Sequence, residues 1–214
     1  MIRLEDITKV YATKRGLHTV LDGVSFEVPL GTSMGIMGKN GAGKSTLLRI
    51  IGGAEMPTSG TVTRGSRVSF PIGFTGAFHG SLTGEENCRF AARIYGQELT
   101  RVVAETRAFA DIGAYFYNPV STYSTGMRAR LAFGLSMSID FDVYLIDEVT
   151  AVGDRRFKKK CQAALKERAA HGSLIVISHS VATLKQLCDK CAVLDQGKLQ
   201  VCASVDEASK LYAA

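Results

Sequence analysis

The sequence lacks any long apolar run. Apolar residues make up 46% of its 214 residues, enough for a sizeable core. No stretch, however, approaches the roughly 20 residues that a helix needs to cross a bilayer. The opening residues MIRLEDITKVY alternate like a strand and contain no apolar core of a signal peptide. We therefore expect a cytosolic chain that reaches a membrane only if another chain holds it there.

Dense charge of one sign is also absent. The net charge is +6, but the basic residues are dispersed along the chain. The densest run, RRFKKK at residues 155–160, is typical of a solvated helix face rather than of a binding patch. We therefore do not expect nucleic acid to be a partner.

Cysteine is sparse, and repeats are missing. Five cysteines without an export signal indicate free thiols. Cys188 and Cys191 form one C-x-x-C, but no second pair or nearby histidine accompanies them, so we interpret the pair as structural. With no internal repeat and no low-complexity linker, the length suits one α/β domain with at most a small insert.

Alternating and apolar segments predict the strands of an α/β core. They occupy residues 2–11, 19–31, 33–37, 143–147, 173–178 and 191–203. The first two alternate, as antiparallel strands with one buried face do. The next three are almost wholly apolar, which is typical of buried parallel strands. The last predicts a hairpin that turns at Gln196 and Gly197.

The insert, at about residues 80–125, has a helical pattern. Thr83 followed by Glu86 forms a capping box that opens a first helix. A second helix is predicted near residues 99–112. After Tyr123 a further helix carries apolar residues at every fourth position, which predicts a buried stripe. The stripe consists of Met127, Leu131, Leu135 and Ile139.

The stretch GKNGAGKS is a candidate phosphate-binding loop. Gly38 and Gly43 are separated by four residues, and Lys44 and Ser45 follow directly. An apolar strand precedes the loop and a helix follows it, which is the context of a P-loop. Backbone N–H groups at the helix start favour phosphate, Lys44 would reach the β- and γ-phosphates, and Ser45 would bind Mg²⁺. The predicted nucleotide-binding residues here are Gly38, Lys39, Asn40, Gly41, Ala42, Gly43, Lys44, Ser45 and Thr46.

Two later strands end in residues that suit phosphate chemistry. VYLIDE would bring Asp147 to the carboxyl end of the sheet beside the loop, where it would hold Mg²⁺. Glu148 could polarise the attacking water. A lone histidine after a strand is more often structural, but His179 would end on the same sheet edge, within reach of a γ-phosphate. We predict ATP and Mg²⁺ as cofactors, and Lys44, Glu148 and His179 as the catalytic residues.

The order of these motifs resembles that of the nucleotide-binding subunit of an ABC transporter, over essentially the whole chain. GKNGAGKS resembles Walker A, and VYLIDE resembles Walker B with its catalytic glutamate. YSTGM at residues 123–127 stands where that family has its LSGGQ signature, and TAVGD ends in Asp154 at the D-loop aspartate position. SHS carries His179 as the switch histidine. Tyr11 matches the aromatic residue that stacks on adenine.

The resemblance implies a fold and an assembly. The fold would be a P-loop NTPase of ABC type, with a RecA-like parallel core, an antiparallel β-subdomain and a helical subdomain at about residues 80–125. Residues 1–214 would form a single ABC ATPase domain. Two copies would pair head to tail as a homodimer, with each ATP between Walker A of one copy and Ser124 and Gly126 of the other. The cycle would drive an integral membrane permease.

Two departures from the family pattern stand out. In the signature, only Ser124 and Gly126 are retained, while Thr125 and Met127 replace a glycine and a glutamine. No glutamine occurs between the phosphate loop and Gln97, so the usual Q-loop glutamine is missing. Another residue must therefore supply the Mg²⁺ contact and the coupling that this side chain normally gives.

The segment that replaces the Q-loop narrows the resemblance. PIGFTGAFHGSLTGEENCRF, together with YSTGMRARLAFGLSMSIDFD and DEVTAVGD, resembles the ATPase subunits of bacterial capsular polysaccharide exporters. We expect an ATP-hydrolysing subunit, peripheral at the cytoplasmic face of the inner membrane, that contacts the polysaccharide only indirectly. We also expect no additional carbohydrate-binding domain at the C-terminal end. Residues 73–87, with the apolar anchors Phe74, Phe78 and Leu82 and the polar His79, are a candidate docking surface for the permease.

Other functions remain open. An ABC ATPase for another surface polymer, O-antigen or teichoic acid, would have nearly the same sequence pattern. A soluble ABC ATPase acting on DNA would carry a long coiled coil, and one acting on the ribosome would fuse two ATPase units; the chain shows neither. A regulatory subunit without activity would be expected to lose Glu148 or His179, and both are present.

Overall fold

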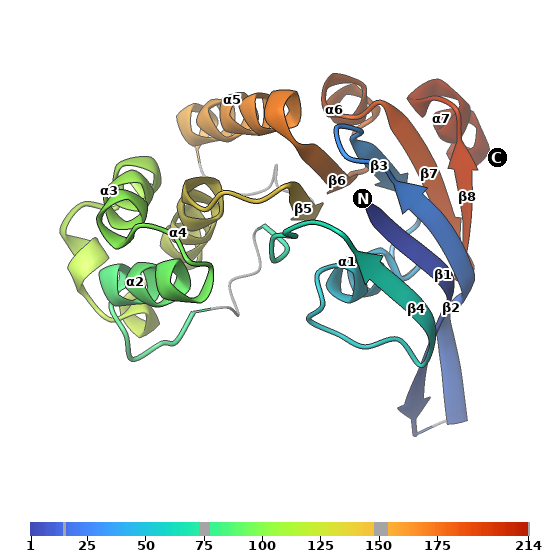
Figure 1. Cartoon of the computed structure of the whole chain (residues 1–214), viewed down its shortest axis with the longest axis horizontal. Helices are drawn as coiled ribbons and strands as arrows, with labels where there is room; N and C mark the ends of the chain where they lie inside the picture. Colours follow the sequence, from blue (N-terminus) through green and yellow to red (C-terminus); the bar gives the residue numbers. More distant parts are fainter. Residues whose placement is uncertain (15, 73–77, 148–153, 214) are drawn as a thin grey trace. The chain divides into compact units, whose positions relative to one another are not determined.

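The computed structural model describes residues 1–14, 16–72, 78–147 and 154–213, which form two compact units (Figure 1). The first unit comprises Met1–Pro71, Phe141–Glu148 and Leu165–Ala214, and the second comprises Ile72–Asp140 and Val149–Ala164.

A three-stranded antiparallel sheet opens the first unit. Its order is β2-β1-β4, with β1 at Ile2–Thr13, β2 at Gly16–Val28 and β4 at Ser59–Arg64. The pairing of β1 with β2 confirms the two strands expected from the alternating pattern. The sequence reasoning missed β4. This edge strand is largely exposed and only Val62 is half-buried, so no apolar alternation marks it.

A five-stranded sheet forms the centre of the first unit, with the order β5-β6-β3-β7-β8. Its strands are β3 (Met34–Met37), β5 (Val143–Asp147), β6 (Ser173–Ile177), β7 (Lys190–Asp195) and β8 (Lys198–Cys202). The first four are parallel, and β8 pairs antiparallel with β7. Gln196 and Gly197 have φ angles of 45° and 79°, as a two-residue hairpin turn requires, which confirms the predicted turn.

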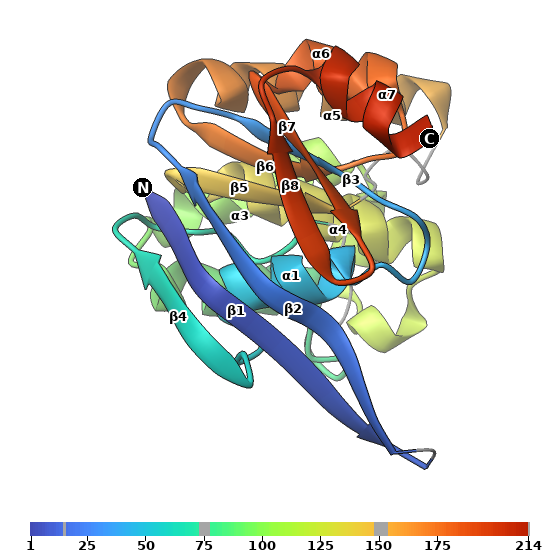
Figure 2. The same cartoon turned by 90° about the vertical axis from the view of Figure 1, so that its right-hand side faces the viewer.

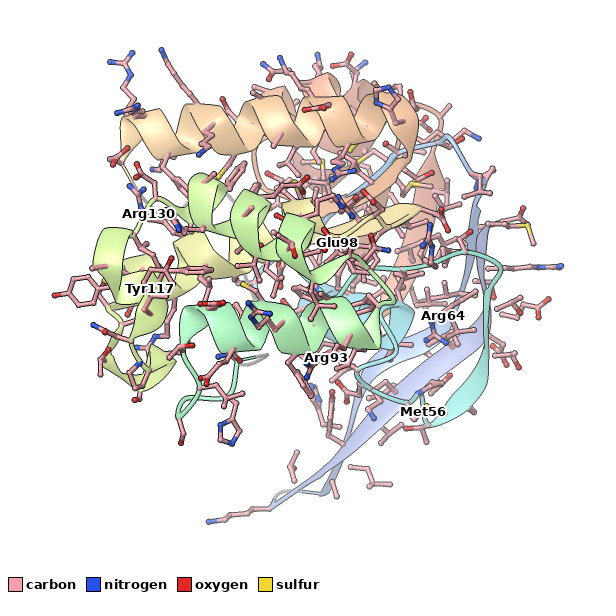
Figure 3. All side chains as sticks on the ribbon, turned by 60° about the vertical axis from the view of Figure 1, so that its left-hand side comes forward. Met56, Arg64, Arg93, Glu98, Tyr117 and Arg130 are labelled. Atoms are coloured by element: carbon pink, nitrogen blue, oxygen red, sulfur yellow. The ribbon has the colours of Figure 1, made fainter. Side chains whose placement is uncertain are left out.

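Helices cover both faces of this central sheet. α1 (Lys44–Ile51) lies between the two sheets, and its apolar residues belong to the same core cluster as residues of both (Figure 2). α6 (Val181–Leu187) and α7 (Val205–Ala213) cover the opposite face. Arg64 on β4 donates to the Ile51 carbonyl oxygen at 2.7 Å and so caps the end of α1 (Figure 3). Across the described part of the chain, none of the helices combines the length and apolar character that crossing a membrane demands.

The second unit is helical. It contains α2 (Gly84–Ile94), α3 (Leu99–Ala110), α4 (Thr125–Ser138) and the first part of α5 (Arg155–His171). The predicted capping box is confirmed. Thr83 Oγ1 accepts from the Glu86 N–H at 3.1 Å, and the Glu86 carboxylate accepts from the Thr83 N–H at 2.8 Å. α3 ends two positions before the predicted residue 112, because Asp111 adopts a left-handed φ of 50°.

The predicted stripe of α4 is confirmed at Leu131, Leu135 and Ile139, which are buried, whereas Met127 is half-buried. Burial also extends beyond the stripe, because every residue from 131 to 138 is buried. On one side Gly134 packs so closely on α3 that a Cβ would lie 3.1 Å from the Thr106 carbonyl oxygen. On another side Phe133 stacks on Phe109 at 5.4 Å and meets Phe157 edge-on at 6.2 Å between ring centroids. A helical segment enclosed on all sides has no polar face, so the stripe understates the burial of the second half of α4.

Candidate functional site

The phosphate loop lies at the mouth of a cavity of about 460 Å³ in the first unit. The cavity is lined by Val20, Asn40, Gly41, Gly43, Lys44, Ser45, Thr46, Arg49, Asp147 and His179. Lys44 is only 8% exposed, and its Nζ donates to the carbonyl oxygens of Gly38 at 2.7 Å and Lys39 at 2.9 Å. The ammonium group therefore lies under its own loop, and three N–H donors let it serve loop and anion together.

Two glycines of the loop are required by close packing. A Cβ on Gly38 would lie 2.3 Å from the Leu194 carbonyl oxygen, where no side chain fits. Gly43 has a φ of 102°, and a Cβ there would lie 2.9 Å from the Val20 carbonyl oxygen. Gly43 is also the N-cap of α1, so the helix can begin at Lys44 with its first N–H groups directed at the cavity.

Asp147 and His179 reach the same cavity because of strand order. Asp147 is the last residue of β5, and His179 follows β6, which lies between β5 and β3. Since the carboxyl ends of parallel strands meet at one sheet edge, both side chains arrive beside the loop that follows β3. Asp147 is half-buried and His179 is exposed. The predicted Glu148 lies outside the described residues.

The cavity offers ligands that suit Mg²⁺. The Ser45 hydroxyl and the Asp147 carboxylate are hard oxygen donors on two walls of the same cavity. A magnesium ion that takes only one or two protein ligands and completes its shell with phosphate and water fits this donor set. In the described residues no cluster of three or more His, Cys, Asp or Glu side chains could hold a metal ion without such help.

Val20 and Arg49 also line the cavity, and the sequence reasoning missed both. Arg49 Nη2 donates to Thr46 Oγ1 at 3.1 Å, one turn earlier on α1. Its place four residues after Ser45 puts it on the same helix face, so helical spacing could have predicted it. Val20 comes from β2, and no local signal links it to the loop.

Tyr11 does not line this cavity, although it was predicted to stack on adenine. Its hydroxyl donates to Glu55 Oε1, and Lys9 Nζ lies 5.0 Å from the ring centroid. Arg49 Nε also donates to Glu55, at 2.9 Å, so one carboxylate joins Tyr11 to a residue that does line the cavity. The hydroxyl is thus a structural partner, whereas a purine would need only the ring.

The Glu55 carboxylate is strongly stabilised in its charged form. Partial burial raises its pKa, but hydrogen bonds from Tyr11, Arg49 and Lys9 outweigh that effect and lower the pKa to about 2. Lys9 Nζ lies 3.0 Å from Oε1. The carboxylate therefore remains ionised and keeps three neighbours in place.

The signature-like residues lie in the second unit, at the start of α4. Ser124 is the N-cap, and its Oγ accepts from the Met127 N–H at 3.2 Å. This confirms that the signature begins a helix. A Cβ on Gly126 would meet only Ser124 Oγ, at 3.9 Å, so the space in front of this helix end is open. Its N–H groups suit an anion.

Asp154 holds two helices of the second unit together. Its Oδ1 accepts from the Phe157 N–H at 2.8 Å, as an α5 cap, and its Oδ2 accepts from Arg130 on α4 at 2.8 Å (Arg130 in Figure 3). The Phe157 N–H and the Arg130 guanidinium lower the pKa of this exposed carboxyl. Asp154 therefore has a structural role in addition to the nucleotide contact predicted for it.

A sequence comparison identifies the family. The family model described as "ABC transporter" matches residues 21–151. The chain belongs to the ABC transporter family. It is an ABC-type ATPase, and ATP is its nucleotide.

Curated relatives match over most of this chain. The capsule polysaccharide export ATP-binding protein CtrD of Neisseria meningitidis serogroup B is 48% identical over 212 residues, covering 99% of this chain and 98% of its own. The polysialic acid transport ATP-binding protein KpsT of Escherichia coli is 50% identical, covering 88% and 85%. The teichoic acids export ATP-binding protein TagH of Bacillus anthracis is more distant, at 40% identity, and covers 89% of this chain but 35% of its own.

A solved structure has the same fold. It is a dimeric, post-hydrolysis state of the ATP-binding cassette MJ0796 bound to ADP and Pi. The TM-score is 0.81 at 22% identity, covering 94% of this chain and 97% of the other. This likeness supports the ABC-type P-loop fold predicted for the chain.

The expected docking segment of this ABC subunit is described only in part, since residues 73–77 lie outside the described residues. Phe78 and Leu82 are half-buried, and His79 is exposed. The Asn87 amide organises the loop at residues 79–83. It accepts from the His79 N–H at 2.9 Å and donates to the carbonyl oxygens of His79, Leu82 and Thr83 at 2.9–3.3 Å.

The C-x-x-C pair lies away from the nucleotide cavity. Cys191 is buried on β7 and Cys188 is half-buried. Burial raises the pKa of the Cys191 thiol to about 11 and raises that of Cys188 further. Thiols with such pKa values are poor nucleophiles and poor metal ligands at neutral pH.

Proposed function

We propose that the chain is the ATP-hydrolysing subunit of a bacterial capsular polysaccharide exporter, peripheral at the cytoplasmic face of the inner membrane. The observation that carries this proposal is 48% identity to a capsule polysaccharide export ATP-binding protein over 99% of this chain and 98% of that one. The cavity that unites the phosphate loop with Asp147 and His179 supplies the chemistry such a subunit needs.

In the proposed mechanism the first unit binds and positions ATP. The N–H groups at the start of α1 and the Lys44 ammonium stabilise charge on the β- and γ-phosphates. Ser45 and Asp147 would hold Mg²⁺, which would neutralise phosphate charge. Glu148 orients and polarises the attacking water, and His179 donates a hydrogen bond to the γ-phosphate. Tyr11 contributes its ring to adenine binding.

Catalysis on this proposal requires a homodimer. The N–H groups at the start of α4, at Ser124 and Gly126, would bind the γ-phosphate held by the other copy, with Asp154 nearby in the interface. The open space in front of Gly126 supports such an approach. The dimeric state of the solved cassette with the same fold supports it as well.

We further propose that residues 1–214 act as one ABC ATPase domain and drive an integral membrane permease. The permease, rather than this chain, would contact the polysaccharide. Residues 73–87 belong to the second unit and follow directly after the point where the chain enters it, so a change in that unit would be passed to a partner bound there. Exposed His79, held by Asn87, supports this surface.

The second candidate is export of another surface polymer. The 40% identity to a teichoic acids export ATP-binding protein favours this over any function outside polymer export, but it is below the 48–50% of the capsule and polysialic acid relatives. The match also covers only 35% of that relative.

A complementation experiment tests the proposal. The gene for this chain is deleted in its host and restored either as the parent or as Lys44→Ala. We expect loss of surface capsule with polymer accumulating in the cytoplasm, rescued by the parent only, because Lys44→Ala removes a charged phosphate partner and weakens ATP binding by roughly tenfold or more. If O-antigen or teichoic acid is lost while capsule remains, the second candidate is correct.

A further inference from the structure

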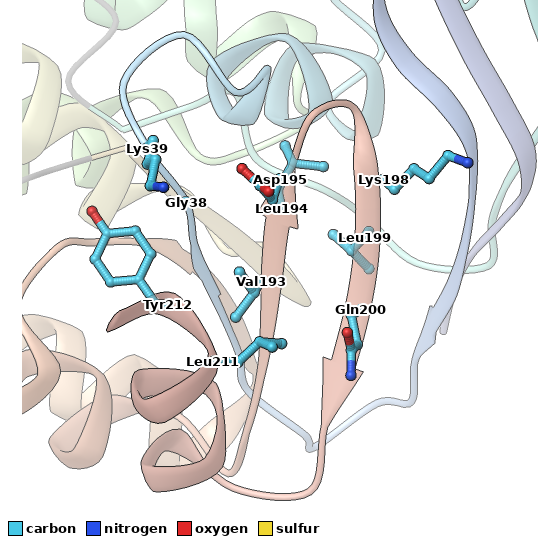
Figure 4. A pocket seen from close by; sticks show the side chains of 10 residues that line it. All are labelled: Gly38, Lys39, Val193, Leu194, Asp195, Lys198, Leu199, Gln200, Leu211 and Tyr212. Atoms are coloured by element: carbon cyan, nitrogen blue, oxygen red, sulfur yellow. The ribbon is translucent and has the colours of Figure 1, made fainter. Parts of the chain in front are cut away.

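The histidine of the nucleotide cavity has a tyrosine partner on α7. His179 Nδ1 lies 3.2 Å from the Tyr212 hydroxyl oxygen, and the two ring centroids are 6.2 Å apart. Tyr212, near the end of α7, lines one cavity together with Lys39 of the phosphate loop (Figure 4). Neither His179 nor Tyr212 lies within the segment matched by the family model, which ends at residue 151.

Contacts at the start of α7 stabilise the helix that carries Tyr212. Ser204 and Glu207 cap the start of α7: Ser204 Oγ accepts from the Glu207 N–H at 3.2 Å, and the Glu207 carboxylate accepts from the Ala203 N–H at 2.8 Å. Lys185 on α6 pairs with Asp206 on α7 at 2.6 Å. Because α6 begins directly after His179 and Ser180, this ion pair links the helix that follows His179 to the helix that carries Tyr212.

The chemistry of the contact depends on the hydrogen bonds that phosphate can form. Phosphate oxygens accept hydrogen bonds, so a histidine beside a γ-phosphate must present an N–H to it. A neutral imidazole has a single N–H, and its other nitrogen is an acceptor. Because the hydroxyl contacts Nδ1, the imidazole can present an N–H to phosphate when the hydroxyl donates to Nδ1 and Nε2 carries the ring proton.

We propose that Tyr212 is a positioning residue for ATP hydrolysis: its hydroxyl donates to His179 Nδ1 and holds the imidazole as the Nε2–H tautomer, oriented toward the γ-phosphate. The proposal rests on the role given to His179 in the proposed function. Without the hydroxyl, the ring can rotate or carry its proton on Nδ1, and the phosphate then meets a lone pair.

Kinetics of the purified full chain provide the first test. In Tyr212→Phe we expect kcat for Mg-ATP hydrolysis to fall roughly three- to tenfold, as the loss of one hydrogen bond predicts, while KM stays within about twofold. Tyr115→Phe, which removes a hydroxyl from an exposed tyrosine in the second unit, is the matched control and should hydrolyse at the parental rate. In a His179→Ala background, Tyr212→Phe should cause no further loss.

The tautomer itself provides the second test. Nitrogen-15 chemical shifts of the His179 ring, assigned with His179→Ala, should report the Nε2–H form in the parent and a mixture in Tyr212→Phe. An unchanged kcat with an unchanged tautomer overturns the proposal. If Tyr212→Phe lowers kcat by the same factor in the parent and in His179→Ala, the proposal is also overturned, because Tyr212 would then act through packing of α7. If His179→Ala hydrolyses at the parental rate, the role of His179 in the proposed function is wrong, and the shifts alone decide whether Tyr212 sets the tautomer.

Discussion

At the scale of single residues, this ABC subunit uses buried or partly buried charges as structural ties beside its nucleotide cavity. Lys44 binds two carbonyl oxygens of its own loop. Glu55 gathers Lys9, Tyr11 and Arg49 around one carboxylate. These contacts hold side chains and backbone at the cavity or beside it. A substitution at one of them therefore changes the free energy of unfolding and the affinity for nucleotide, and the two changes can differ in size.

The two functions of Tyr11 can be separated by substitution. Tyr11→Ala should weaken ATP binding by roughly 1–2 kcal/mol through loss of an aromatic stack. Tyr11→Phe keeps the ring but loses the bond to Glu55, so it should bind ATP like the parent while the free energy of unfolding falls by about 1 kcal/mol. Nucleotide titration and urea denaturation measure the two quantities. Equal losses of affinity in both variants would contradict stacking.

Glu55 should make stability depend on pH in acid. Its pKa in the folded chain is about 2, below the ordinary value of 4.5, so its contribution is fully present above about pH 5 and is lost as the pH falls toward 2. Comparing Glu55→Gln with the parent by chemical denaturation should show a stability gap at pH 7 that narrows on acidification through this range. If the difference in stability between the variant and the parent does not change with pH, the charge of Glu55 is not the source of its stabilising effect.

At the scale of elements, helix ends carry most of the candidate chemistry. α1 begins at the phosphate loop, α4 begins at the signature-like residues, and α5 is capped by Asp154. The start of α2 is different, because its capping box and the Asn87 amide hold the preceding residues 79–83 in a defined loop.

Asn87 should therefore be essential for the order of that loop. Asn87 is 4% exposed, and Asn87→Ala would remove the hydrogen bonds of the amide and leave the His79 N–H without this acceptor, at about 2 kcal/mol of unfolding free energy. Thermal and urea denaturation would measure the loss, with exposed Asn118→Ala as the matched control. Equal stability of the two variants would show that water replaces the amide without cost.

At the scale of the whole molecule, the proposed reaction needs two copies. The phosphate loop lies in the first unit and the signature-like helix start in the second. ATP bridging these surfaces across a dimer would make association depend on nucleotide, and hydrolysis would release it. This is the step that would transmit work to a permease.

A trapped dimer would show this step. The Glu148→Gln variant should bind Mg-ATP, hydrolyse it very slowly and remain a dimer. Size-exclusion chromatography with light scattering would detect the dimer. Adding Gly126→Asp should abolish the dimer, since a carboxylate would face the γ-phosphate, while the open space at this position leaves the fold intact. Gly126→Ala serves as the steric control. Parental turnover in Glu148→Gln would show that Glu148 is not the base.

The sequence alone determined those features of this ABC subunit that depend on residues close together in the chain. Glycine spacing predicted the phosphate loop, alternation predicted β1 and β2, and Thr83 with Glu86 predicted the start of α2, because each depends on neighbours in the chain. The motif order pointed to the family that the comparison confirmed.

Only the tertiary structure decided which distant residues meet. Polar β4 joined the sheet through pairing with β1 rather than through its own pattern. The second half of α4 is enclosed on all sides because α3 and Phe157 of α5 pack on it. The Tyr11 hydroxyl contacts Glu55, which is 44 residues away in sequence. Tyr212 contacts His179, which is 33 residues away. Such contacts depend on how separate elements pack, which periodicity within one element does not encode.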